Sequence, residues 1–323
     1  MGTLILSTDD VKSCADIKAV LEAVEGAFIE YGEGRAIMPP KEYIDLPKGD
    51  FRAMPSFIDG AVGLKWVCVY PDNPKKESLP TVMGVVILCD PDTGYPISVM
   101  DGTLVTQLRT GASAGVASKY LARGDSESVG LVGCGAQART QLKAILANFD
   151  IDIIKIYDIS RDVVAGFKEY FSDENLNILE CTIEEVVGCD IISTVTPVRE
   201  PLVKREWVRS GTHINAIGAD APGKQELDSK IIIDAKVVVD DIRQASHGGE
   251  INVPIAENIF KSEDIYATLG EIVSGRKNGR ESDEITVFDS TGLAIQDMAT
   301  AKVIYQVAKD KGLGILVDFV GMD

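Results

Sequence analysis

The chain has 323 residues, which exceeds the size at which one hydrophobic core usually stops growing, so two domains are expected. Apolar residues make up 45% and charged residues 25%, as in globular proteins, so broad disorder is excluded. Asp and Glu number 50 against 32 Lys and Arg, and the net charge of −18 would repel nucleic-acid phosphates and anionic membranes. We therefore expect neither a nucleic-acid nor a membrane partner.

The cysteines and the N-terminus bear on the compartment. The six cysteines lie far apart, with no Cys-x-x-Cys pair and no neighbouring histidine that would indicate zinc, so we expect reduced thiols and no metal site. Residues 1–10 carry too short an apolar run for a signal peptide, and no stretch approaches about 18 consecutive apolar residues. These features predict a cytoplasmic protein.

The first part of the chain predicts a small α+β unit. Asp16 is a typical helix N-cap, and apolar residues at helical spacing follow it as far as Gly32. Strands are predicted at residues 51–54, 61–69, 81–88 and 95–100, and a long helix at residues 103–121.

From residue 128 the chain alternates between short apolar strands and helices. Strands are predicted at residues 128–132, 153–157, 177–180, 191–195, 213–217, 237–240 and 285–288. This alternation predicts an α/β fold with a parallel, doubly wound Rossmann sheet. With a last helix at 292–311 that crosses back, we expect a Rossmann domain at 119–297 and a smaller domain made of 1–118 and 298–323.

A glycine-rich turn predicts a dinucleotide site. Gly133-x-Gly135-x-x-Ala138 follows an apolar strand directly and opens the helix predicted at residues 137–148. Gly133 permits the tight turn, Gly135 permits close approach of a pyrophosphate, and Ala138 keeps helix and strand close. N–H groups at the helix start, including those of Ala136 and Gln137, would face the phosphates. A glycine-rich turn without a ligand is the alternative.

Asp158 ends the next strand, 20 residues after Ala138, where a ribose-binding acid belongs. An acid there accepts hydrogen bonds from the ribose hydroxyls and repels a 2′-phosphate, so NAD is favoured over NADP. Arg161, three residues later, is the feature that favours NADP.

Several segments together resemble the ornithine cyclodeaminase and mu-crystallin family, most closely its alanine dehydrogenase branch. They are Arg52-Ala53-Met54-Pro55, Gly63-Leu64-Lys65-Trp66, Leu108-Arg109-Thr110-Gly111, the block from His213 to Lys224, and Phe288-Asp289-Ser290-Thr291-Gly292. The resemblance implies a homodimer in which the smaller domain forms the dimer interface and one wall of the substrate site. It also implies hydride transfer from the Cα of an amino acid to NAD, giving an imine that is hydrolysed or attacked internally.

The family segments also suggest substrate residues. Arg52 and Arg109 are suited to hold a substrate carboxylate, because the planar guanidinium binds both oxygens, and Lys41 would add a third positive charge. Without the resemblance, each would more often be a surface cation. Lys65 lies in an apolar strand and is the expected base, unless strand alternation points it to solvent. The family pattern makes Asp220 the second acid or base, although Asp is also common in such turns.

Further cofactor contacts are expected beyond the phosphate turn, although hydroxyls at strand ends also cap helices. These residues are Thr110, Thr194, Thr196, Ile217, Ala219, Lys224 and Ser290.

Arg52 bears on the choice of substrate. Ornithine cyclodeaminases carry an acid in this segment that holds the distal amine of ornithine, whereas a cation would repel that amine. We therefore expect reversible NAD-dependent deamination of L-alanine to pyruvate and ammonia. The alternatives are an ornithine cyclodeaminase, a reductase of cyclic imines such as pyrroline-2-carboxylate, and a non-enzymatic binding protein like the mu-crystallins.

Overall fold

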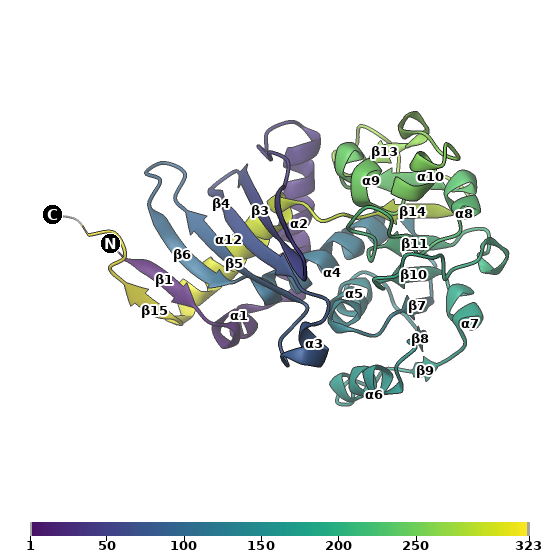
Figure 1. Ribbon diagram of the computed structural model, residues 1–323, viewed down its shortest axis with the longest axis horizontal. Helices are drawn as coiled ribbons and strands as arrows, with labels where there is room; N and C mark the ends of the chain where they lie inside the picture. The colour runs from purple at the N-terminus through teal and green to yellow at the C-terminus, as the bar shows by residue number, and fades with distance from the viewer. Residues whose placement is uncertain (1, 322–323) are drawn as a thin grey trace. The chain divides into compact units, whose positions relative to one another are not determined.

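The computed structural model describes residues 2–321, which divide into two compact units (Figure 1). Residue 1 and residues 322–323 of the smaller predicted domain lie outside the described residues. Unit 1 runs to Arg109 and resumes at Leu293, and unit 2 is Thr110–Gly292. These limits precede the expected ones because the first falls inside the long helix α4 (Gly102–Leu121), which contributes to both units.

Unit 1 is built on a seven-stranded sheet of order β15-β1-β6-β5-β4-β3-β2. Its strands are β1 (Thr3–Leu6), β2 (Glu42–Leu46), β3 (Gly49–Ile58), β4 (Ala61–Val69), β5 (Val82–Cys89), β6 (Pro96–Asp101) and β15 (Ile315–Val317). The four predicted strands are confirmed, the first with longer bounds. The sequence analysis missed β1, β2 and β15, which lie at or next to the sheet edges and are too short or too exposed for a clear apolar pattern.

Four helices besides α4 belong to unit 1: α1 (Thr8–Cys14), α2 (Ile17–Gly32), α3 (Asn73–Lys76) and α12 (Ala294–Lys311). The predicted cap of α2 is confirmed, because Asp16 accepts a hydrogen bond from the Lys18 N–H at 3.0 Å. Helix α12 packs on α2 and runs across β3, β4 and β5 (Figure 1). Gly63 permits this approach, since a Cβ there would lie 2.1 Å from the Ile87 carbonyl oxygen and 2.9 Å from Met298 Sδ.

Unit 2 is built on an eight-stranded parallel sheet of order β13-β12-β14-β11-β10-β7-β8-β9. Its strands are β7 (Ser128–Val132), β8 (Ile153–Tyr157), β9 (Ile178–Glu180), β10 (Ile191–Thr194), β11 (His213–Ala216), β12 (Lys236–Val239), β13 (Ala267–Thr268) and β14 (Thr286–Asp289). Its helices are α5 (Ala136–Leu146), α6 (Arg161–Tyr170), α7 (Ile183–Val187), α8 (Ser229–Asp234), α9 (Ile242–Gly248), α10 (Asn252–Ala256) and α11 (Leu269–Val273), with 3-10 turns η1 (Arg205–Trp207) and η2 (Ser262–Asp264).

The doubly wound sheet predicted from the sequence is confirmed. Strand β7 pairs with β8 on one side and with β10 on the other, so the winding of the chain reverses at β7. Ligands of such sheets bind at the carboxyl ends of the strands at this reversal. The sequence missed only the two-residue strand β13 of this sheet.

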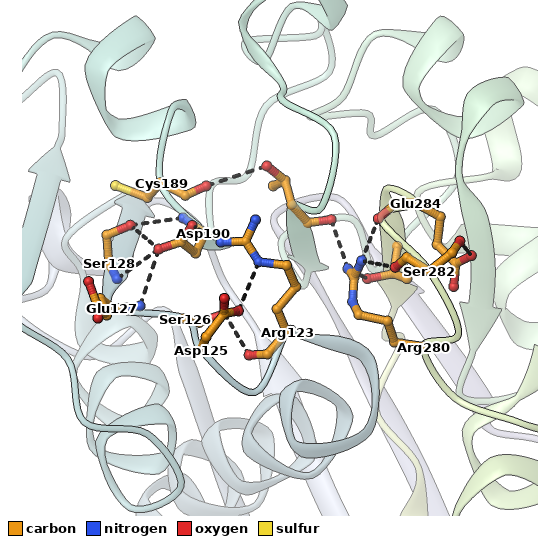
Figure 2. Close-up of polar contacts among 12 residues, drawn as sticks. Arg123, Asp125, Ser126, Glu127, Ser128, Cys189, Asp190, Arg280, Ser282 and Glu284 are labelled. Atoms are coloured by element: carbon orange, nitrogen blue, oxygen red, sulfur yellow. Dashed lines mark hydrogen bonds and ion pairs between the residues drawn. The ribbon is translucent and has the colours of Figure 1, made fainter.

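Two arginines fasten the opposite, amino-terminal edge of this sheet (Figure 2). Arg123 donates to Asp190 at 2.7 Å, and the second oxygen of Asp190 accepts from the N–H and hydroxyl of Ser128 at the start of β7. Arg280 donates to the carbonyls of Leu121, Ser282, Glu284 and Thr212 and to the Thr286 hydroxyl. The amino edge is therefore closed by polar contacts, which leaves the carboxyl edge for a ligand.

His213 at the start of β11 fills a structural position. Its ring lies 2.9 Å from the Thr286 hydroxyl and 3.1 Å from Asn215 Oδ1, and burial lowers its pKa to about 3. All six cysteines are free thiols. Across residues 2–321, no helix has the length and apolar character needed to span a membrane.

Candidate active site

The predicted phosphate turn joins β7 to α5 in unit 2. Gly133 has a φ of +96°, a conformation that favours glycine, and a Cβ there would lie 3.0 Å from Thr196 Cγ2 and 3.1 Å from the Val195 carbonyl oxygen. At Gly135, the N-cap of α5, a Cβ would meet no atom of residues 2–321 within 4 Å. Packing therefore explains Gly133, whereas the space beside Gly135 suits a phosphate approaching the helix start.

Other residues of this turn also fit a dinucleotide. Ala138 is fully buried against the sheet, as the motif requires. The Gln137 Oε1 atom is buried and has no hydrogen-bond partner within the described part of the chain. An acceptor in this state is available to a donor from a ligand.

Asp158 lies beside the phosphate turn. One of its carboxylate oxygens accepts the N–H of Cys134 at 2.9 Å, and the other accepts the N–H of Ser160 at 2.8 Å. The structure thus brings together the predicted ribose acid and the predicted phosphate turn, and it fixes the acid from both sides. Arg161 opens α6 and is exposed.

The threonines predicted at the next strand end have a partner inside the protein. The hydroxyls of Thr194 and Thr196 each donate to Glu226 at 2.7 Å. The same carboxylate accepts the N–H groups of Thr196 at 2.7 Å and of Gly218 at 2.8 Å. Glu226 therefore joins the loops that follow β10 and β11. Sequence analysis missed it because it lies in an irregular segment without helical or strand periodicity.

Further buried acids lie beneath this edge. The Glu250 carboxylate accepts the backbone N–H groups of Glu226 and Leu227, and burial raises the pKa of both glutamates, well above the usual range for Glu250. Burial, together with the charge of Asp240, raises the pKa of Asp289 to about 8. These acids therefore hold protons more tightly than carboxyls in water do.

Asp240 holds the segment that follows β14. It accepts the N–H groups of Thr291 and Gly292 at 2.7 Å each and the hydroxyl of Ser290 at 3.3 Å. The predicted cofactor residue Ser290 is thus hydrogen-bonded to a buried acid that the sequence analysis missed.

The predicted acid Asp220 lies in the loop after β11. Its carboxylate accepts a hydrogen bond from Lys224 Nζ at 2.5 Å, and both side chains are partly exposed. Asn252 fixes the loop by accepting from the Gly223 N–H and donating to the Lys224 carbonyl. The Asn252 side chain therefore anchors the loop through two of the loop's backbone groups.

Three further predicted residues of this unit are buried. Ile217 and Ala219 are buried directly after β11. Thr110 is buried in α4, and its carbonyl accepts from the Gln141 side chain at 3.2 Å.

Unit 1 contains the predicted base. Lys65 is fully buried, and its Nζ donates to Asp297 Oδ1 of α12 at 2.8 Å. The alternative orientation toward solvent is wrong, because strand alternation exposes Trp66 instead. Arg109 also donates to Asp297 Oδ1, at 3.1 Å, and to Gln296 Oε1 at 3.0 Å. The structure therefore brings Lys65 and Arg109 together on one carboxylate.

The surroundings of Lys65 set its protonation. Burial, together with the positive charges of Arg109 and Lys41, lowers its pKa to about 7, although the contact with Asp297 acts in the opposite direction. The electrostatic effect of Lys41 places this third predicted cation near the pair. An amine with this pKa exchanges its proton readily at neutral pH.

Arg52 lies on the same face of the sheet as Lys65. Met54 pairs with Lys65 across β3 and β4, and Arg52 is two residues from Met54. Its guanidinium is buried, forms an ion pair with Asp50 at 2.6 Å, and lies 5.4 Å from the centre of the Tyr43 ring. Both predicted carboxylate-binding arginines are thus buried rather than solvated.

The sequence analysis missed the acceptors of these cations: Asp50, Gln296 and Asp297. An acid in the mostly apolar first turns of α12 was the available signal for Asp297. Over residues 2–321, no cluster of three or more His, Cys, Asp or Glu side chains is arranged to hold a metal ion.

Comparisons with known proteins agree with this architecture. The model of the ornithine cyclodeaminase/mu-crystallin family matches residues 1–312. The alanine dehydrogenase of Archaeoglobus fulgidus is 52% identical over 320 residues, which is 99% of each chain. An archaeal alanine dehydrogenase dimer solved with bound NAD superposes with a TM-score of 0.96, at 52% identity, and the match covers 99% of this chain and 100% of the other. The Delta(1)-pyrroline-2-carboxylate reductase of Thermococcus litoralis, solved with NADH and L-proline, gives 0.93 at 40% identity, with 97% and 99% covered.

Proposed function

Because the chain belongs to the ornithine cyclodeaminase/mu-crystallin family, we propose that it is an NAD-dependent dehydrogenase of L-alanine. The reaction converts L-alanine, NAD and water into pyruvate, ammonium, NADH and a proton, and it is reversible. The observation that carries the proposal is the buried Lys65 in contact with Asp297 and close to the buried Arg109. This arrangement supplies a base that titrates near neutral pH next to a cation suited to a carboxylate.

Unit 2 is the proposed NAD-binding unit. The open space at Gly135 and the N–H groups at the start of α5 suit the pyrophosphate, and the fixed carboxylate of Asp158 suits the ribose hydroxyls. When bound, NAD supplies the hydride acceptor. The two solved relatives that contain NAD or NADH support this assignment.

Unit 1 supplies the proposed substrate residues. Arg52 and Arg109 would bind the alanine carboxylate, and Lys41 would add positive charge. The neutral form of Lys65 would take a proton from the substrate amine or from the water that attacks the imine carbon. We assign Asp220 as a second acid or base, with Lys224 holding its carboxylate.

Arg52 supports alanine over a diamino acid. A cation in this segment repels a distal ammonium, and Asp50 already neutralises part of its charge without offering an open carboxylate. The 52% identity to an alanine dehydrogenase points the same way.

A panel of L-amino acids with NAD tests the proposal. NADH should form with alanine and water, and pyruvate and ammonium should accumulate in equal amounts. Activity confined to ornithine, with proline as the product, would refute it.

Reduction of a cyclic imine is the second candidate, because a relative at 40% identity was solved with NADH and L-proline. Such an imine carries the same carboxylate and needs the same hydride. NADH oxidation by pyruvate plus ammonium, compared with oxidation by pyrroline-2-carboxylate, separates the two. The activity with the larger kcat/KM is the assigned one.

We also propose that the chain is a homodimer. On the sheet face opposite Lys65, Trp66 stacks on Phe51 at 5.4 Å and pairs with Val85, and Ile44 pairs with Phe51. Trp66, Val85 and Ile44 are exposed, so this face is an apolar surface of unit 1. The dimeric alanine dehydrogenase relative supports a second copy as the occupant. Light scattering should give twice the mass of one chain. The Val85→Glu variant should give the mass of a single chain.

A further inference from the structure

Asp297 is the point at which the cations of unit 1 converge. Its Oδ1 atom accepts from Lys65 Nζ at 2.8 Å and from Arg109 Nε at 3.1 Å, and the side chain is fully buried. Its Oδ2 atom is buried and has no hydrogen-bond partner among residues 2–321. All of the observed hydrogen bonding of this carboxylate therefore goes through one oxygen.

The charged groups around Lys65 come from several elements. Asp297 lies on α12, Arg109 on α4 and Lys41 just before β2, while Arg52 shares the sheet face and is paired with Asp50. Asp297 is the anion that contacts Lys65, and the charges of two further cations, Arg109 and Lys41, lower the pKa of Lys65. A buried ammonium in such surroundings needs this negative charge to keep its proton.

We propose that Asp297 is the positioning residue of this site: its Oδ1 atom holds Lys65 and Arg109 in fixed relation, and its charge keeps Lys65 able to carry a proton at neutral pH. The proposal rests on the function proposed above. Lys65 and Arg109 would contact substrate, whereas Asp297 would act only through them. Without its charge, Lys65 would be neutral over most of the pH range and would lack the proton needed for the reverse reaction.

The geometry permits a substitution that separates charge from shape. In Asp297→Asn the amide oxygen replaces Oδ1 and keeps both hydrogen bonds, while the NH₂ group replaces Oδ2, which accepts no hydrogen bond among the described residues. The side chain keeps its size and the shared acceptor and loses its charge, while the NH₂ group adds two N–H donors at the buried Oδ2 position.

The main test is the pH dependence of kcat/KM for alanine with saturating NAD. In the wild type the rate should rise with pH as Lys65 loses its proton near pH 7. In Asp297→Asn this rise should move to lower pH by about one unit or more, which is about a tenfold weaker proton affinity. A rise at the wild-type pH, with only a lower rate or lower stability, would show a merely structural role and would overturn the proposal.

Two variants support this test. Asp50→Asn neutralises the partner of Arg52 in the same sheet without touching Lys65, so it should alter the KM for alanine and leave the rise in place. Gln296→Glu adds a negative charge where Oε1 accepts from Arg109, so it should move the rise to higher pH. If Asp297→Asn does not fold, the absence of this opposite shift overturns the proposal.

An equilibrium measurement keeps the inference testable if the wild type has no dehydrogenase activity, which would refute only the proposed function. The free energy of unfolding is measured against pH with Lys65 and with Lys65→Met, in the wild-type and Asp297→Asn backgrounds. Because burial lowers the pKa of Lys65 in the folded state, the Lys65-dependent part of the stability should rise with pH from about 7 until the unfolded amine titrates. The rise should begin at lower pH in the Asp297→Asn background, and an unchanged onset would refute the inference.

Discussion

Both units bury ionisable groups, but the site of unit 1 has more cations than anions, whereas the carboxyl edge of unit 2 has buried acids. In unit 1, Lys65 and Arg109 share the single carboxylate of Asp297. In unit 2, Glu226 and Glu250 are buried together, and their observed hydrogen bonds come from backbone N–H groups and hydroxyls. Burial lowers the pKa of the lysine in the first case and raises the pKa of both glutamates in the second.

The difference shows that burial shifts the pKa of each group so that its neutral form is favoured. The neighbouring charges and hydrogen bonds set the size of that shift. In unit 1 the result is a base that titrates near pH 7, which is useful for proton transfer. In unit 2 the acids organise loops at the carboxyl edge of the sheet. The cations also supply a local positive field for an anionic substrate, which the net charge of −18 does not.

The largest expected effect is that of Lys65→Met. Removing the base should lower kcat for alanine by about 10³-fold, the usual range for a positioned acid or base. The dissociation constant for NADH should stay within about twofold, because the predicted dinucleotide contacts are in unit 2. Steady-state rates and a fluorescence titration of NADH measure the two quantities. A variant that keeps its rate would remove Lys65 from the mechanism and leave the buried cations of unit 1 without a catalytic role.

The next effect concerns the acids of unit 2. Glu226→Ala leaves the N–H groups of Thr196 and Gly218 without their buried acceptor, and it should lower the free energy of unfolding by about 3 kcal/mol. Glu226→Gln keeps one acceptor oxygen and should cost less. Urea unfolding measures both, with the surface variant Glu174→Ala as the control. Equal stability of Glu226→Ala and the control would show that this carboxylate does not hold the loops.

An effect of comparable size that depends on pH is expected for Asp289→Asn. The folded-state pKa of Asp289 is about 8, above its unfolded value, so the stability that its proton confers is complete at low pH and is lost as pH rises through 8. The asparagine does not titrate. As pH rises from 5 to 8, the free energy of unfolding of the variant, relative to that of the wild type, should therefore increase by up to about 1.4 kcal/mol per pH unit. Urea unfolding at several pH values measures the gain, and parallel curves would contradict the prediction.

The glycine turn between β7 and α5, the strands β7 and β8, and the position of Asp158 beside the turn could be predicted from the sequence because their signal is local: an apolar strand, glycines at fixed spacing and an acid at the next strand end. Arg52, Lys65 and Arg109 were selected by family segments, since a lone cation in a strand or a helix does not by itself indicate a site. The structure adds that all three are buried.

The partners of these residues could not be predicted. Asp297 is 232 residues from Lys65, and the contact depends on how α12 packs across the sheet. Glu226 reaches Thr194 across 32 residues through a segment without periodicity. The edge strands were missed for two different reasons: β2 is exposed along its whole length and so has no apolar pattern, whereas the three-residue β15 pairs with β1 at the other end of the chain.

The smallest expected effect tests whether burial, and not distance, distinguishes the groups compared here. Lys76 and Asp72 form an ion pair at 2.6 Å, shorter than the 2.8 Å between Lys65 and Asp297, but both of its side chains are two-thirds exposed. Water screens such a pair, so Asp72→Ala should leave the thermal unfolding midpoint unchanged within error. Asp297→Ala should lower it clearly, because it leaves buried cations without their anion. Equal shifts in the two variants would mean that contact distance decides, and the contrast between buried and exposed charge would fail.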